Sequence, residues 1–104
     1  MKNNIVYMVE FDWSVENDCN VETELFFDYN KALERYDELI ANELDPNLSW
    51  VGDLAIKPNG CINKGYTLEQ YGDRTKKENL YWHCTMDDYY MYHSIIQLKQ
   101  LEIK

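Results

Sequence analysis

The chain has 104 residues, a formal net charge of −9 and a hydrophobic content of 45%. This length suits one domain, residues 1–104, that buries a core without disulfides or a structural metal, and an aromatic content of 14% excludes a disordered acidic tail. No apolar run reaches the roughly 18 residues of a membrane span, and the start of the chain lacks the apolar region of a signal peptide, so we expect a cytoplasmic protein.

Negative charge is concentrated in the first half of the sequence. Residues 1–53 hold thirteen Asp or Glu against three Lys or Arg, whereas residues 54–104 hold six against seven. Negative charges this dense repel one another. They are therefore either solvent-exposed surface without a further role, or they bind a basic partner. Duplex DNA is disfavoured as a direct ligand, because only the segment 73–79 carries a local surplus of basic residues.

Two strands are predicted at the start of the chain. Residues 5–13 and 21–27 each place apolar side chains at every second position, which is the period of a half-buried strand. The polar segment 14–20 between them suits a hairpin loop, so we expect the two strands to pair antiparallel.

An amphipathic helix is predicted after the second strand. From Asp28 the apolar period changes to about 3.6 residues, and Asp28 can cap the first turn by accepting backbone N–H bonds. The Asp45-Pro46 pair should end the helix, since the residue before a proline avoids helical geometry. The expected buried stripe is Ala32, Leu33, Tyr36, Leu39, Ile40 and Leu44.

The remaining sequence predicts loops and a closing hairpin. Residues 46–79 are rich in turn signals and should contain one short strand near 54–57, while 80–85 and 89–103 should pair around a turn at 86–88. The apolar positions of the last strand change phase near Lys99 and Gln100, which predicts a β-bulge there. We therefore expect an α+β fold, an antiparallel sheet of four to five strands in β-β-α-β-β order with the helix on one face.

The first hairpin suggests a carboxylate ladder. If both strands turn their apolar sets to one face, Glu10 lies opposite Glu24 and Asp12 lies opposite Glu22 on the outer face. Opposed carboxylates about 5 Å apart destabilise a sheet by a few tenths of a kcal/mol per pair, so folding alone does not favour them. Their density approaches that of duplex DNA, about one charge per 1.7 Å, so this face could stand in for a phosphate backbone.

Two apolar residues, Met8 and Phe26, fall opposite each other beside the ladder in the same register, where they could anchor a partner. Acids on the helix extend the surface. The predicted partner-binding residues are Glu10, Asp12, Glu22, Glu24, Phe26, Glu34, Asp37 and Glu38. The alternative is that these acids serve only solubility or discourage edge-to-edge aggregation. A two-residue slip in register would also separate the opposed pairs.

Catalytic and metal sites are weakly indicated. His83 and His93 could meet across the closing hairpin, but zinc needs further ligands at a recognisable spacing, and no serine or cysteine is placed for attack. Calcium and glycine-rich phosphate loops are missing from the sequence. Cys19, Cys61 and Cys84 are scattered singly, as is typical of free thiols, with Cys84 at an inward strand position. We therefore expect no catalytic residue, metal or cofactor.

The chain resembles in type the small acidic proteins of phages and mobile elements, among them anti-CRISPR and other anti-defence inhibitors that mimic nucleic acid. The resemblance covers the whole chain and rests on the acidic hairpin start, the helix sequence of residues 31–36 (KALERY) and the tyrosine-rich closing hairpin. It implies a non-enzymatic inhibitor, in a bacterial host cytosol, that occupies the nucleic-acid-binding surface of a host defence protein. The alternatives are a small adaptor or homo-oligomeric structural domain, and an enzyme.

Overall fold

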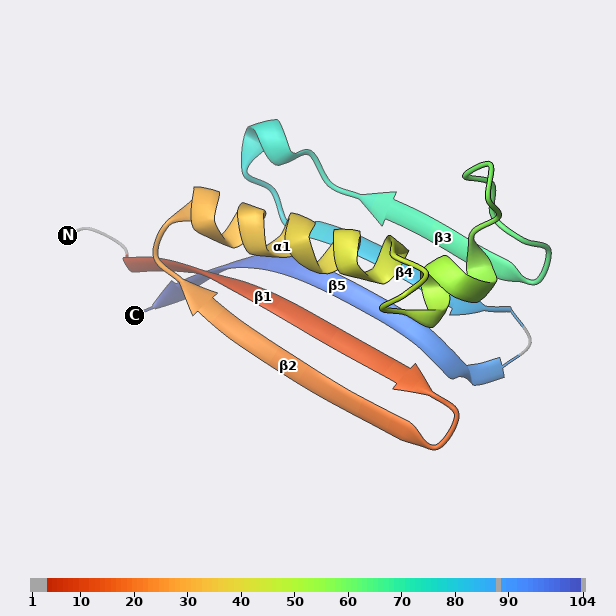
Figure 1. Ribbon diagram of the computed structural model, residues 1–104. Coiled ribbons are helices and arrows are strands. Elements are labelled where there is room, and N and C mark those ends of the chain that lie inside the picture. The colour runs from red at the N-terminus through yellow and green to blue at the C-terminus, as the bar shows by residue number, and fades with distance from the viewer. Residues whose placement is uncertain (1–3, 88, 104) are drawn as a thin grey trace.

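The computed structural model describes residues 4–87 and 89–103, and all side chains in these ranges except those of Tyr89 and Tyr90. Five antiparallel strands form one open sheet with the order β2-β1-β5-β4-β3, and one long helix covers part of one face (Figure 1), which confirms the α+β prediction. The elements are β1 (Asn4–Val15), β2 (Asp18–Phe26), α1 (Tyr29–Leu44), the π-helix η1 (Val51–Ala55), β3 (Tyr66–Tyr71), the 3₁₀ helix η2 (Arg74–Lys76), β4 (Leu80–Met86) and β5 (Tyr89–Ile103).

Helix α1 begins and ends where the sequence predicts. The Asp28 side chain accepts a hydrogen bond from the backbone N–H of Asn30 at 2.8 Å, and Asp45 lies just beyond the last turn. The buried residues of the helix are Tyr29, Ala32, Tyr36, Leu39 and Glu43. The predicted stripe is therefore wrong at its end, because Leu44 is 41% exposed and Glu43 takes the buried position.

The core lies between α1 and the middle strands of the sheet. Trp82 of β4 and Ile96 and Leu98 of β5 are at most 1% exposed, and Val9 of β1 is 2% exposed. Burial of a side chain of this size stabilises the fold by about 1.5 to 3 kcal/mol. We call the side of the sheet that carries these residues and α1 the helix face, and the opposite side the open face.

The first hairpin is tighter than the sequence predicts. β1 continues to Val15 and β2 begins at Asp18, so only Glu16 and Asn17 form the turn, and Glu16 adopts a left-handed backbone with φ 52°. Most of the segment 14–20, which we expected to be a loop, is therefore strand. β2 lies at one edge of the sheet (Figure 1), and every residue from Asp18 to Leu25 is exposed.

The segment 46–79 contains the fifth strand. The predicted short strand near 54–57 is wrong, because η1 occupies residues 51–55 and only an isolated bridge joins Ile56 to Ile62. The strand lies later, at β3. η1 packs tightly against the end of α1, since a Cβ at Gly52 would lie 2.4 Å from the Leu44 carbonyl oxygen. The basic residues of the segment 73–79 lie at positions 74–77, which are exposed and include η2.

The predicted bulge in β5 is also wrong. β5 pairs with β1 in one continuous register from Asn4 opposite Ile103 to Val15 opposite Tyr92. The apolar positions of β5 change from even to odd numbers because they lie on different faces: Ile96 and Leu98 are on the helix face, and Leu101 and Ile103 are on the open face. The irregularity occurs in β4, between Thr85 and Met86. Of the predicted turn at 86–88, Asp88 lies outside the described residues.

Candidate protein-binding surface

The predicted carboxylate ladder does not form. β1 and β2 pair in a register that places Glu10 opposite Thr23 and Glu24 opposite Val9. Directly opposed residues share a face of the sheet, so Glu24 lies with Val9 on the helix face and Glu10 lies on the open face. The cause is the two-residue turn, which pairs odd positions with even ones. Glu22 likewise lies on the helix face, opposite Phe11, and not beside Asp12.

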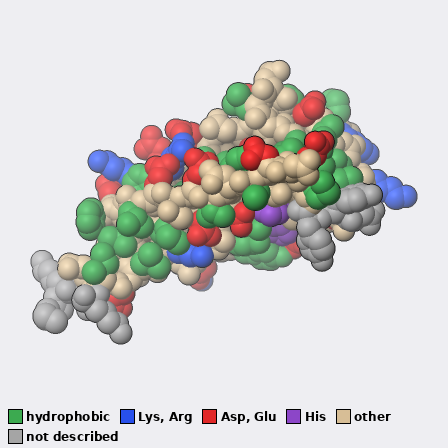
Figure 2. All heavy atoms as spheres, turned by 90° about the horizontal axis from the view of Figure 1, so that it is seen from below, with side chains coloured by type: hydrophobic (Ala, Val, Ile, Leu, Met, Phe, Trp, Pro, Cys, Tyr) green, Lys and Arg blue, Asp and Glu red, His purple; other side chains and the backbone are tan. Residues whose placement is uncertain are grey.

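On the open face, the two acids of β1 have partners from β5. Glu10 accepts a hydrogen bond from Gln97 at 3.3 Å and lies 3.8 Å from the Lys99 ammonium, and Asp12 lies 3.0 Å from His93 Nε2. Figure 2 shows the molecule from below, where histidine, acidic and hydrophobic side chains lie side by side. These pairings bring Glu10 and Asp12 into a mixed surface instead of a purely acidic one.

On the helix side, Arg35 pairs with two of the predicted residues, and two further predicted acids lie on the same two elements. The Arg35 guanidinium donates to Glu24 of β2 at 2.8 Å and also pairs with Glu38 on α1. Glu22 is two positions from Glu24 on the same face of β2, and Glu34 is one helical turn before Glu38 on α1. Glu22 and Glu34 are exposed, and neither forms an ion pair with another described residue. We call Glu22, Glu24, Glu34 and Glu38 the helix-side acidic group.

The remaining predicted residues lie apart from this group. Asp37 accepts two hydrogen bonds from the Arg74 guanidinium, at 2.8 and 3.1 Å, and so joins α1 to η2. Phe26 lies opposite Tyr7, is half-buried and packs against the core, whereas Met8 lies opposite Leu25 on the open face. The predicted Met8–Phe26 pair is therefore wrong, and Leu25, 65% exposed, is the apolar neighbour of Met8.

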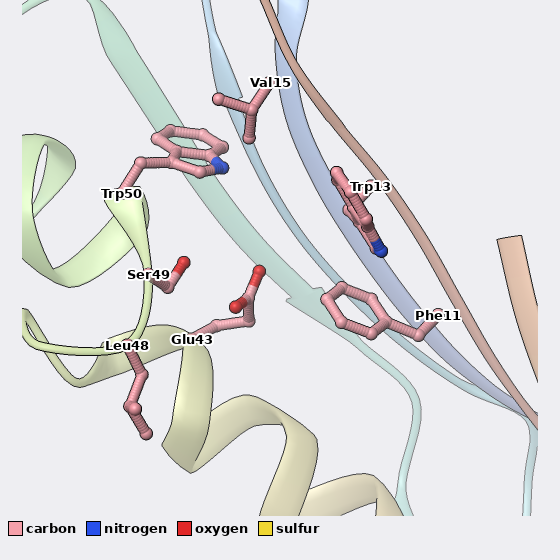
Figure 3. Close-up of a pocket in the computed structure, with 7 residues that line it drawn as sticks. All are labelled: Phe11, Trp13, Val15, Glu43, Leu48, Ser49 and Trp50. Atoms are coloured by element: carbon pink, nitrogen blue, oxygen red, sulfur yellow. The ribbon is translucent and has the colours of Figure 1, made fainter. Parts of the chain in front are cut away.

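A cavity of about 330 Å³ lies between the end of α1 and the helix face of β1 (Figure 3). α1 leaves this end of β1 partly uncovered, so the aromatic side chains there are only half-buried. The lining residues of this aromatic cavity are Phe11, Trp13, Val15, Glu43, Leu48, Ser49 and Trp50.

Glu43 is the polar residue that α1 contributes to the aromatic cavity. It is 8% exposed, and one of its carboxylate oxygens accepts a hydrogen bond of 2.5 Å from the Ser94 hydroxyl of β5. Figure 3 shows the carboxylate directed into the space between Ser49 and Phe11. The nearby Cys84 thiol is fully buried, and burial, with a smaller contribution from the Glu43 charge, raises its pKa to about 12.

Trp50 forms the wall opposite Phe11 and Trp13 in Figure 3. Its ring packs edge-on to Tyr92, with centroids 5.5 Å apart, and lies 5.9 Å from the ring of Tyr66. The Trp50 N–H is buried without an acceptor among the described residues, a condition it shares with Trp82 in the core. These aromatic contacts hold the wall of the cavity in place.

The two histidines lie near each other across the closing hairpin, as diagonal neighbours and not directly opposite. His83 lies opposite Ile95, and His93 lies opposite Thr85, so the two are diagonal neighbours on the open face. His83 Nε2 lies 3.9 Å from Glu69. Within residues 4–87 and 89–103, no group of three or more His, Cys, Asp or Glu side chains is placed to bind a metal ion. All three cysteines are free thiols, and Cys84 is inward-facing as expected.

The chain matches no protein-family model, no curated protein and no solved structure. In the described part of the chain, no helix is both long enough and apolar enough to cross a membrane.

Sequence reasoning missed the aromatic cavity, although one signal was present. Glu43 continues the spacing of the buried positions Tyr36 and Leu39 at intervals of three and four residues, which places it on the buried side of α1. Its polarity led to the opposite prediction. Trp50 lies in a segment with no apolar period, so nothing local indicated that it would close a cavity against β1.

Proposed function

We propose that this chain is a non-enzymatic protein that binds a basic protein surface through the helix-side acidic group. The observation that carries the proposal is the charge of the elements that present the group. Residues 18–44, which form β2 and α1, hold eight Asp or Glu against Lys31 and Arg35. Arg35 lies between Glu24 and Glu38 and holds their carboxylates on one side of the molecule.

A partner with clustered Lys and Arg is the chemical complement of this surface. Surfaces of that kind bind the phosphates of nucleic acids, so a carboxylate surface that occupies one would act as a competitive inhibitor. The resemblance to anti-defence proteins supplies the first class of partner to test, a nucleic-acid-binding defence effector of a bacterial host. The alternative, a structural or adaptor domain whose acids serve only solubility, predicts no dependence of binding on particular carboxylates.

The test is capture of a basic partner at low salt, followed by competition between this chain and nucleic acid for that partner. Glu22→Lys and Glu34→Lys each change the net charge by two, and each should weaken capture about tenfold and reduce its salt dependence. Glu102→Lys is the matched control, because Glu102 is an exposed acid at the far end of the sheet, opposite Ile5. Equal capture by all three variants would contradict the proposal.

A further inference from the structure

The walls of the aromatic cavity have the composition of a site for an organic cation. Phe11, Trp13 and Trp50 line it together with a single carboxylate, Glu43. The face of an aromatic ring attracts a cation within about 6 Å of its centroid, and the attraction grows when water is excluded. A carboxylate beside such rings adds an opposite charge at short range.

Glu43 has less compensation than a buried carboxylate usually needs. The Ser94 hydroxyl supplies one hydrogen bond, and no Lys, Arg or His in residues 4–87 and 89–103 pairs with Glu43. Burial of a charge is costly unless a counter-charge accompanies it. A cation in the cavity would supply that counter-charge.

The rim of the cavity carries further carboxylates. β2 pairs with β1 so that Glu22 lies opposite Phe11 and Asp18 lies opposite Val15, with all four residues on the helix face. Glu22 and Asp18 are exposed, so their field reaches the mouth of the cavity. A cationic group would be attracted by the rim before it meets the aromatic walls.

We propose that the aromatic cavity receives the guanidinium group of an arginine side chain of the basic partner. This proposal rests on the proposed function. Arginine suits the walls better than lysine, because the guanidinium is more weakly hydrated and stacks on aromatic rings. The volume of about 330 Å³ is near the lower end of ligand pockets, about 300 to 1,000 Å³, and fits one long side chain.

The experiment uses the whole chain and three short peptides that are identical except for a central arginine, lysine or citrulline. Citrulline keeps the size and planar shape of the arginine head group but has a carbonyl oxygen in place of one nitrogen group, so it carries no charge.

Binding is followed through the indole N–H signals of Trp13 and Trp50 in two-dimensional NMR spectra. Trp82 is an internal reference, because it is fully buried in the core and does not line the cavity. The arginine peptide should shift the Trp13 and Trp50 signals, the lysine peptide should bind several-fold more weakly, and the citrulline peptide should shift nothing.

The decisive variant is Glu43→Gln, which keeps an acceptor for the Ser94 hydroxyl and removes only the charge. It should weaken arginine-peptide binding at least about tenfold. Glu34→Gln removes one charge from the exposed side of α1, away from the cavity lining, and should change binding less than about twofold. Unfolding by urea should be unchanged in both variants, which shows that the fold is intact. Trp13→Leu keeps an apolar lining but removes one ring, so it should also weaken binding of the arginine peptide.

Three results would overturn the proposal: equal shifts with the citrulline peptide, equal affinity for arginine and lysine, or unchanged affinity in Glu43→Gln. The proposed function fails separately. If Glu43→Gln captures a basic partner as well as the unmodified chain while Glu22→Lys does not, the arginine site is wrong and the acidic surface stands. If the arginine peptide binds through Glu43 but Glu22→Lys and Glu34→Lys leave capture unchanged, the acidic surface is wrong and the cavity stands.

Discussion

The two halves of the helix face differ in what covers them. Under α1, β4 and β5 turn Trp82 and Ile96 into the core, and both side chains are fully buried. On the same face, β2 turns out Glu22 and Glu24, which are exposed. One helix is too narrow to cover five strands, so one half of the face became core and the other became acidic surface. The aromatic cavity lies where the two halves meet, beside the end of α1.

The largest effect on stability is expected from the covered half. Trp82→Ala should lower the free energy of unfolding by about 3 to 5 kcal/mol, because it removes a fully buried ring and leaves a cavity. Glu22→Ala in β2, on the uncovered half of the same face, should change it by less than about 0.5 kcal/mol, since Glu22 is exposed. Urea unfolding of both variants measures the difference. A comparable loss for Glu22→Ala would mean that β2 is covered in solution.

Alkaline pH should also destabilise the protein through the covered half. Burial raises the pKa of the Cys84 thiol from 9.0 to about 12, and burial raises the pKa of Tyr36 from 10.0 to about 12. Below about pH 8 both groups are neutral in the folded and the unfolded states, so they do not make the stability depend on pH. Between pH 9 and 12 only the unfolded chain ionises at these groups, so stability falls by on the order of 2 to 4 kcal/mol per group.

Unfolding by urea at pH 8, 10 and 11 tests this dependence. In Cys84→Ala the loss of stability should begin about one pH unit higher, because the main remaining group, Tyr36, has the higher ordinary pKa of 10.0. The exposed Cys19 and Cys61 should react with a thiol reagent in the folded state at pH 8, while Cys84 should react only after unfolding. A midpoint that stays constant up to pH 11 would contradict the burial of both groups.

The covered half was the more predictable from sequence. Asp28 and Pro46 mark the ends of α1, and the alternation of residues 5–13 marks β1, because these signals depend on local backbone chemistry. The register of the first hairpin could not be predicted in the same way. A period of two does not say which face is inward, and β2 carries apolar side chains on both faces, with Leu25 exposed and Phe26 half-buried. The length of the turn, two residues and not seven, decided the register.

Of the candidate site, only the excess of negative charge could be predicted from the sequence. Acidic residues in β2 and α1 could be counted from the sequence, but which of them share a face depends on the register. Arg35 joins Glu24 to Glu38 because β2 lies beside α1, and Arg74 reaches Asp37 across 37 positions of sequence. Contacts between distant segments are set by packing, which no short pattern in the sequence records.

The smallest effect concerns Arg35, where the two halves meet. Arg35→Gln should lower the free energy of unfolding by no more than about 1 kcal/mol, because the Arg35 ion pairs with Glu24 and Glu38 are exposed at the surface. The same change should tighten capture of a basic partner a few-fold, since it frees two carboxylates and removes a repelling charge.

Arg74→Gln is the matched control: it breaks the exposed pair with Asp37, outside the helix-side acidic group, and should cost similar stability without tightening capture. Urea unfolding and binding at two salt concentrations measure both quantities, and equal tightening in the two variants would assign the effect to net charge alone.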